Sequence, residues 1–215
     1  MSSKLRLSPL IVVVLSSLIC SSHVVLSLNV VLAGGSGPVG KTLASQLSPK
    51  HKVTILSRNA YLASAPNRVT EVFGWVGEAY LKKFPHVSIR DWDGGDLLDI
   101  VGCDWMGWQE DTLKHADVVV NLVGGFTEQR VMATERIVRE SLSVNPSALQ
   151  VTVGVMDEEL EGLPLAKMKK DRLKLCEEMV SSNCVNYVCL RLEDNRLEQG
   201  CEKLKKVIED LDSSQ

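Results

Sequence analysis

Short apolar runs alternate with amphipathic segments along most of the chain. Runs rich in β-branched and other apolar residues predict strands at 28–33, 52–57, 86–92, 117–123, 149–155 and 187–192. The segments between them predict helices at 41–47, 78–84, 109–115, 127–142, 163–181 and 197–211. This alternation predicts an α/β fold, namely a doubly wound parallel sheet of about six strands with right-handed crossovers.

Two predicted helices carry start signals, and one predicted strand has a distinctive pattern. Thr127 precedes the helix at 127–142 and is placed to cap it, and Pro164 lies in the first turn of the helix at 163–181. The strand at 117–123 contains the apolar, β-branched run 118–120 and is followed by Gly124 and Gly125, which is typical of a parallel strand buried on both faces.

Residues 1–27 have the pattern of an N-terminal leader, and residues 28–215 form the predicted domain. Lys4 and Arg6 precede an apolar stretch at 10–20, which small residues follow. This pattern predicts a secretory signal peptide or signal anchor, with an organelle transit peptide as the alternative. The corresponding locations are the secretory pathway or a membrane, or else a plastid or mitochondrion. Any membrane contact is expected through this leader only.

Composition indicates an ordinary globular domain and argues against a nucleic-acid partner. The 215 residues are 45% hydrophobic and 24% charged, and the formal net charge is −3. Such a balance lacks the basic surface of a nucleic-acid binder. The first 70 residues nevertheless contain 7 Lys and Arg and no acid, which fits either a phosphate-bearing ligand or a targeting leader.

A glycine-rich loop follows the first predicted strand of the domain. Its spacing is GxxGxxG, and it lies directly between a strand and a helix, as a dinucleotide-binding fingerprint requires. In such a loop the first glycine permits the tight turn, the second lets the backbone approach the pyrophosphate, and the third packs helix against strand. The predicted cofactor-binding residues here are Gly34, Ser36, Gly37, Pro38, Val39 and Gly40.

Two other interpretations of this loop stay open. It also fits a glycine-rich turn without a ligand. Moreover, residues 35–42 match the GxxxxGKT string of a phosphate-binding loop for nucleoside triphosphates. That second interpretation lacks a magnesium-binding carboxylate, because the strand at 117–123 closes without an acid.

The end of the second predicted strand bears on the choice of cofactor. A dinucleotide fold that prefers NAD places an acid there to bind the ribose hydroxyls, whereas this chain has Ser57, Arg58 and Asn59. Arg58 can clamp a 2′-phosphate. The sequence therefore favours NADP(H) over NAD(H), unless Arg58 is a solvated loop residue.

Other clusters do not indicate a metal site or a disulfide framework. The six cysteines contain no CxxC pair or metal-ligand spacing, so buried small side chains explain them best. Asp residues crowd 91–104 without the spacing of a calcium loop, which favours a solvated acidic loop. Tryptophans in the same region are expected to cover an edge of the core, and no histidine is assigned to catalysis.

At two motifs the chain resembles the short-chain dehydrogenase/reductase superfamily, in particular its extended and atypical NAD(P)-dependent epimerase/dehydratase branch. VLAGGSGPVG at 31–40 is similar to that branch's strand-plus-glycine opening, and DVVVNLVG at 117–124 looks like its fourth strand and NLAG-type turn. The resemblance covers about 28–192. It implies that Asp93 lies near the adenine and that Leu122, Val123, Gly124 and Gly125 lie near the nicotinamide ribose.

The chain departs from this superfamily in two respects. A Tyr-x-x-x-Lys pair normally transfers the proton after the fifth strand, but none of Tyr61, Tyr80 and Tyr187 has a lysine four residues on. After the sixth strand only residues 193–215 remain, so the substrate lobe of extended members is reduced or missing.

These departures leave two hypotheses for the function, and no catalytic residue is assigned. One is an NADP(H)-dependent oxidoreductase or epimerase-like enzyme that acts on a small molecule with a non-standard acid. The other is a catalytically inactive protein that senses the nucleotide or serves as a scaffold.

Overall fold

The computed structural model describes residues 27–66, 76–92, 94, 107–124, 127–192 and 197–212. The predicted leader, apart from Ser27, lies outside the described residues. The division of the chain into a leader and a domain therefore stays a prediction.

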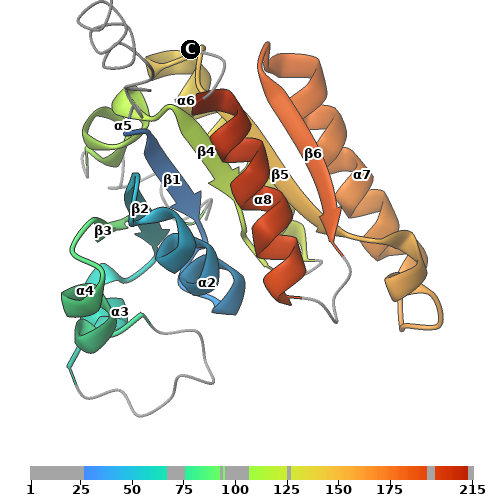
Figure 1. Ribbon diagram of the computed structural model, residues 1–215. Helices are drawn as coiled ribbons and strands as arrows, with labels where there is room; N and C mark the ends of the chain where they lie inside the picture. The colour runs from blue at the N-terminus through green and yellow to red at the C-terminus, as the bar shows by residue number, and fades with distance from the viewer. Residues whose placement is uncertain are drawn as a thin grey trace, which may run out of the picture.

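Six parallel strands form one sheet at the centre of the molecule (Figure 1). Their order is β3-β2-β1-β4-β5-β6, the arrangement of a dinucleotide-binding fold. The strands are β1 (Asn29–Ala33), β2 (Lys52–Ser57), β3 (Val87–Asp91), β4 (Val118–Asn121), β5 (Leu149–Val155) and β6 (Tyr187–Leu192). The register pairs Ala33 at the end of β1 with Leu56 of β2 and with Asn121 of β4. The predicted doubly wound parallel sheet is confirmed.

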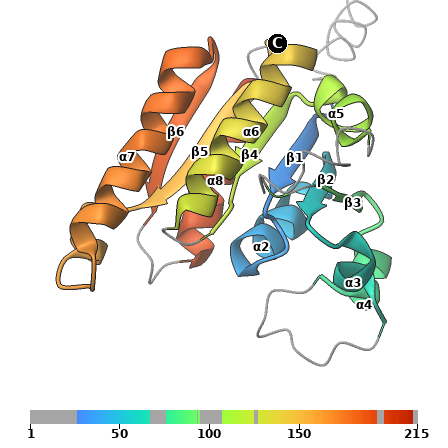
Figure 2. The same cartoon turned by 180° about the vertical axis from the view of Figure 1, so that it is seen from behind.

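Helices cover both faces of the sheet. Figure 1 shows α2 (Pro38–Leu47) and α8 (Leu197–Asp212) in front of it, and α4 (Glu78–Lys83) contributes to the same apolar cluster. Figure 2 shows α5 (Trp108–Asp111), α6 (Glu128–Val144) and α7 (Ala166–Asn183) over the opposite face. Three short helices complete the described elements: α3 (Ala60–Ser64), η4 (Leu113–His115) and η5 (Asp157–Leu160).

The core is divided between the two faces of the sheet. Alternate residues of β1, such as Val30 and Leu32, pack under α2 and α8, whereas Val31 and Ala33 pack under α5 and α6. Because both faces are covered, the central strands are buried on both sides, which explains the continuous apolar runs at 30–33 in β1 and 118–120 in β4.

Helix boundaries differ from the prediction by three residues at two starts. α2 begins at Pro38 rather than at residue 41, because proline suits the first helical position, where no N–H partner is needed. α7 begins at Ala166 rather than at residue 163, because Leu165 has φ 60° and so cannot belong to the helix. Thr127 occupies the N-cap position of α6 but makes no capping hydrogen bond with its side chain.

The cysteine and tryptophan predictions hold for most of the described residues. Cys176, Cys184 and Cys201 are buried, but Cys189 on β6 is exposed, which the prediction of buried thiols did not anticipate. Trp92 and Trp108 are buried and pack edge to face, with ring centroids 5.7 Å apart.

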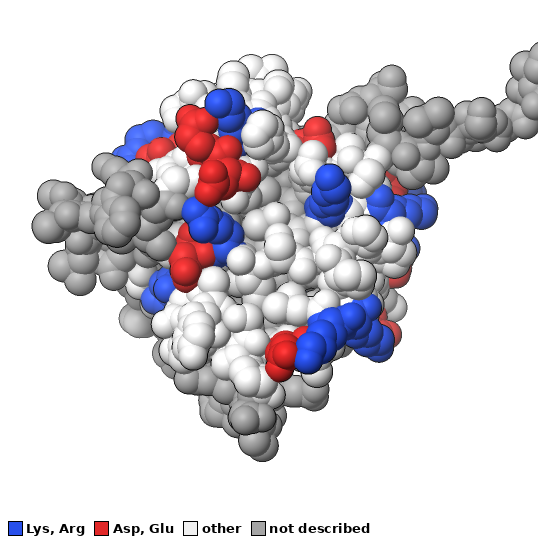
Figure 3. Space-filling model, turned by 90° about the vertical axis from the view of Figure 1, so that its left-hand side faces the viewer, with Lys and Arg blue, Asp and Glu red and all other residues white. Residues whose placement is uncertain are grey.

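Charged side chains of both signs are interspersed on the face at the β3 end of the sheet. Figure 3 shows acidic and basic groups next to one another around a broad area without charge. Such mixing agrees with the small net charge of the chain. Among the described residues, no helix combines the length and the apolar character needed to cross a bilayer.

Candidate dinucleotide-binding site

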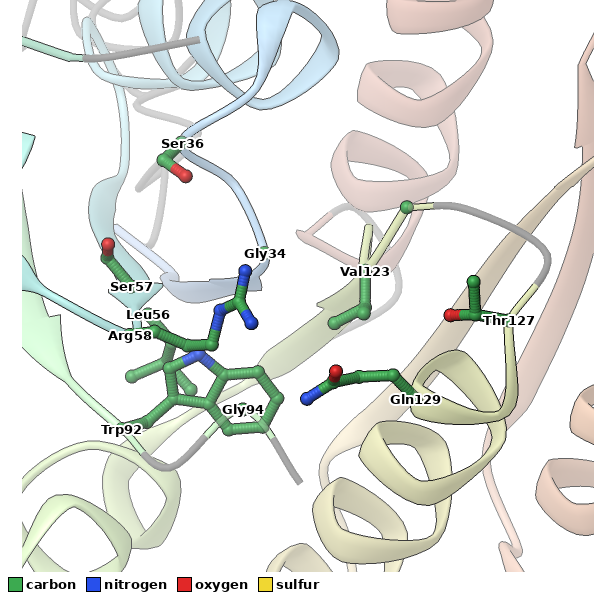
Figure 4. A pocket seen from close by; sticks show the side chains of 11 residues that line it. Gly34, Ser36, Leu56, Ser57, Arg58, Trp92, Gly94, Val123, Thr127 and Gln129 are labelled. Carbon is green, nitrogen blue, oxygen red and sulfur yellow. The ribbon is translucent and has the colours of Figure 1, made fainter. Parts of the chain in front are cut away.

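A cavity of about 370 Å³ opens where β1, β2 and β4 end. From β1 the sheet continues to β2 and β3 on one side and to β4, β5 and β6 on the other. Open parallel sheets bind ligands in the crevice at such a switch point. We call this cavity the switch-point crevice (Figure 4). Its lining residues are Gly34, Ser36, Leu56, Ser57, Arg58, Trp92, Gly94, Val123, Gly124, Thr127 and Gln129.

The glycine loop forms one wall of the crevice and leads into α2. Gly37 is the N-cap residue of α2 and supplies no side-chain cap, so the first helical N–H groups have no partner within the helix. These amides lie at the positive end of the helix dipole, which makes the loop suitable for an anion. A Cβ at Gly37 would have no atom within 4 Å, so space remains open against the backbone there.

Two other glycines of the loop are required by its packing. Gly34 has φ +73°, and a Cβ there would lie 2.8 Å from the Cα of Val123. At Gly40 a Cβ would lie 2.1 Å from the carbonyl oxygen of Gly35, so α2 could not approach the loop as closely. The loop is therefore held by Gly34 and Gly40 and left accessible at Gly37.

Arg58 at the end of β2 reaches across the crevice. Its guanidinium points into the cavity between Gly34 and Trp92 in Figure 4. Its aliphatic stem lies against Gly94, where a Cβ would come within 2.6 Å of the Arg58 Cδ. Gly94 has φ +73°, so this position favours glycine for both reasons. The stem is thereby supported while the charged group stays exposed to the crevice.

Some predicted site residues lie away from the lining of the crevice. The Asn59 side chain accepts a hydrogen bond from the Leu62 N–H (2.8 Å) and so caps α3. The other predicted residues outside the lining are Gly37, Pro38, Val39, Gly40 and Leu122. Of these, Gly37 and Leu122 adjoin lining residues in sequence, whereas Pro38, Val39 and Gly40 belong to the first turn of α2. Asp93 and Gly125 lie outside the described residues.

Sequence reasoning missed several residues that line the crevice. Gln129 and Thr127 come from the start of α6, and in Figure 4 the Gln129 amide points towards Trp92 across the cavity. Leu56 and Gly94 complete the side next to β2 and β3. No local motif marks these residues, and only the strand order brings them together.

The lysine and threonine of the GxxxxGKT string do not face the glycine loop's crevice. Lys41 and Thr42 line a different cavity, between α2 and α4. The Lys41 ammonium lies over the Tyr80 ring, 5.6 Å from its centroid. This placement argues against a loop that binds nucleoside triphosphates, in which the lysine reaches the phosphates.

None of the three tyrosines lines the switch-point crevice. Tyr61 on α3 is 81% exposed, and Tyr187 begins the edge strand β6. The Tyr80 hydroxyl donates a hydrogen bond to the Lys41 carbonyl (2.6 Å). The structure thus provides no tyrosine beside the crevice that could replace the missing Tyr-x-x-x-Lys pair.

Comparisons with known proteins give a structural likeness only. No model of a protein family matches the sequence, and no curated protein matches it. Among solved structures, a protein assigned to the short-chain dehydrogenases/reductases from Corynebacterium glutamicum has a TM-score of 0.55 at 15% identity. That match covers 84% of this chain and 91% of the other.

Two further enzymes, one of them an epimerase, are also similar. The UDP-N-acetylglucosamine 4-epimerase from Methanobrevibacter ruminantium has a TM-score of 0.50 at 18% identity, covering 77% of this chain and 54% of that one. The Bordetella bronchiseptica enzyme WbmF in complex with NAD+ has a TM-score of 0.52 at 13% identity, with coverages of 79% and 50%. The chain thus spans about half the length of these two proteins.

These likenesses agree with the strand order and with the position of the glycine loop between β1 and α2. The predicted resemblance is therefore confirmed at the level of the fold. The chain has a Rossmann fold like that of these three proteins, a short-chain dehydrogenase/reductase, a UDP-N-acetylglucosamine 4-epimerase and an enzyme solved with NAD+.

Proposed function

We propose that the chain binds NADP(H) in the switch-point crevice. In this proposal the diphosphate lies against the free amides at the start of α2, beside Gly37. Arg58 binds the 2′-phosphate, with Ser36 and Ser57 nearby as hydroxyl donors. Leu122, Val123 and Gly124 adjoin the nicotinamide ribose.

The position of Arg58 is the observation that carries this proposal. Its guanidinium projects into the same cavity that the glycine loop lines, and its stem is supported by Gly94. No acid occupies the neighbouring positions at the end of β2, where Ser57 and Asn59 flank the arginine. An arginine at this place favours a cofactor with a 2′-phosphate over one with free ribose hydroxyls.

Titration calorimetry with NADPH and NADH tests the proposal. We expect Arg58→Ala to weaken NADPH binding by about tenfold to a hundredfold, because a charge-assisted hydrogen bond to phosphate is lost. NADH binding is expected to change by about twofold or less. Arg139→Ala is the matched control, since Arg139 is an exposed arginine on α6. Equal losses for the two cofactors would refute the assigned role of Arg58.

The chemistry performed with the cofactor divides into two candidates. The structural likeness to short-chain dehydrogenases/reductases and epimerases favours an oxidoreductase or epimerase-like enzyme that acts on a small molecule. The placement of all three tyrosines away from the crevice favours a nucleotide sensor or scaffold without catalysis. Incubation of the protein with NADPH and a panel of carbonyl compounds tests the oxidoreductase, which consumption of NADPH would support. Because an epimerase regenerates its cofactor, binding without consumption supports the sensor only if the compounds are also not isomerised.

A further inference from the structure

Arg130 carries a buried charge beside the switch-point crevice. Its side chain is 7% exposed, and no other Lys, Arg, Asp or Glu among the described residues is buried. It lies in the first turn of α6, next to the lining residue Gln129. Its guanidinium does not form an ion pair with any described carboxylate, and its Nε has no hydrogen-bond partner among the described residues.

The polar contacts of this guanidinium join two strand ends. Nη1 donates to the carbonyl of Val123, which follows β4, over 3.1 Å. Nη2 donates to the carbonyl of Val153 in β5. Burial lowers the pKa of Arg130, with Cys176 and Glu177 acting in the opposite direction, but an arginine stays charged in proteins. A buried cation is costly, and here its compensation comes from the main-chain carbonyls of Val123 and Val153, together with Cys176 and Glu177 of α7.

Both main-chain polar groups of Val123 form hydrogen bonds with side chains. Its N–H donates to the Oδ1 of Asn121 (3.1 Å), and its carbonyl accepts from Arg130. Asn121 in turn donates to the Thr134 hydroxyl (3.0 Å), and that hydroxyl donates to the Arg130 carbonyl (2.8 Å). These contacts form a closed, partly buried ring of hydrogen bonds between β4 and α6, which fixes the turn that lies against Gly34.

We infer that Arg130 is a positioning residue for the half of the crevice that receives the nicotinamide mononucleotide. This inference rests on the proposed function. A Rossmann fold consists of two mononucleotide-binding halves, one on each side of the switch point. Arg130 contacts the ends of β4 and β5, which belong to the second half, whereas Ser57 and Arg58 belong to the first. Loss of Arg130 therefore affects binding of the whole dinucleotide more than binding of its adenosine portion.

Calorimetry with two ligands tests this role. NADPH spans both halves of the crevice, whereas adenosine 2′,5′-bisphosphate occupies the first half only. For Arg130→Met we expect NADPH to bind about tenfold more weakly and the bisphosphate to bind within about twofold of the wild type. Arg130→Lys keeps the charge and one donor group, so it should recover part of the NADPH affinity. Arg136→Met, on the same helix at an arginine paired with Glu140, is the control and should bind both ligands normally.

Each result decides the role of Arg130. Equal losses for the two ligands, or unchanged NADPH binding, would overturn it. Thermal unfolding is measured in parallel to show that each variant folds. If Arg130→Met does not fold, the Arg130→Lys protein must show weaker binding of NADPH and unchanged binding of the bisphosphate. A wild-type protein that binds neither ligand would refute the proposed function. If the wild type binds both ligands and the Arg130 variants bind both equally more weakly, only this inference is refuted.

Discussion

At the scale of single residues, the glycine loop separates structural from ligand-binding requirements. Gly34 allows the turn to touch Val123, and Gly40 allows α2 to touch Gly35. Neither requirement applies at Gly37, because its φ is −78° and there is open space where a Cβ would lie. Nothing in the described protein therefore requires glycine at position 37, whereas a diphosphate in van der Waals contact with the backbone would require it.

Alanine substitutions at two of these glycines should have opposite consequences. We expect Gly37→Ala to change the free energy of unfolding by about 1 kcal/mol or less and to weaken NADPH binding by about tenfold. Gly40→Ala should instead destabilise the protein by about 1–3 kcal/mol, because its methyl group meets the Gly35 carbonyl. Urea denaturation and calorimetry measure both effects. NADPH affinity unchanged in Gly37→Ala would exclude close contact between this backbone and the diphosphate.

At the scale of elements, a tyrosine hydroxyl links α4 to α2 by a hydrogen bond. Tyr80 donates to the Lys41 carbonyl over 2.6 Å and packs against Phe84, with ring centroids 4.7 Å apart. Burial raises the pKa of Tyr80 to about 12, although a hydrogen bond with Ser45 acts in the other direction. A short helix such as α4 depends on contacts of this kind, because six residues do not form a stable helix alone.

Tyr80→Phe should reveal this contact through the pH dependence of stability. The folded protein retains the phenolic proton to a higher pH than the unfolded chain, whose tyrosines titrate near about 10. The stabilisation is therefore present below pH ~10 and is lost as the pH rises from ~10 towards ~12. We expect urea denaturation to show a steeper loss of stability over that interval for the wild type than for Tyr80→Phe. The variant should also be about 1 kcal/mol less stable at neutral pH.

Tyr61→Phe serves as the comparison for this experiment. Tyr61 is 81% exposed on α3, so its hydroxyl has no buried contact to lose. If the Tyr61 and Tyr80 variants lose stability in parallel above pH ~10, the Tyr80 hydroxyl does not fasten α4 to α2.

Sequence patterns predicted the strands better than the helix starts. The bounds of β2, β5 and β6 match the prediction, and polar residues flank the apolar, β-branched runs of β2 and β6. The short helix α3 was missed, since the Ala60 N–H at its start is bonded to Asp91 of β3, 31 residues away. No local pattern contains such a contact.

At the scale of the whole molecule, the strand order determines which residues share the crevice. The glycine loop and Arg58 could be predicted because a strand, a turn and a helix adjoin them in sequence. Gln129 and Gly94 were not predicted, because they approach Arg58 only after β4 and β3 take their places on opposite sides of β1 and β2. The contacts of Arg130 were missed for the same reason, since one of its carbonyl partners follows β4 and the other lies in β5.

The melting temperature measured with and without ligand tests whether a dinucleotide stabilises the folded molecule as a whole. A ligand at about 100 times its Kd stabilises the folded state by about 2.7 kcal/mol. For a domain of this size that corresponds to a rise in Tm of about 5–10 °C. We expect NADPH to produce such a rise and ATP with Mg²⁺ to produce none, because Lys41 and Thr42 of the GxxxxGKT string face the cavity between α2 and α4. A rise with ATP and Mg²⁺ but not with NADPH would instead identify the glycine loop as a site for nucleoside triphosphates.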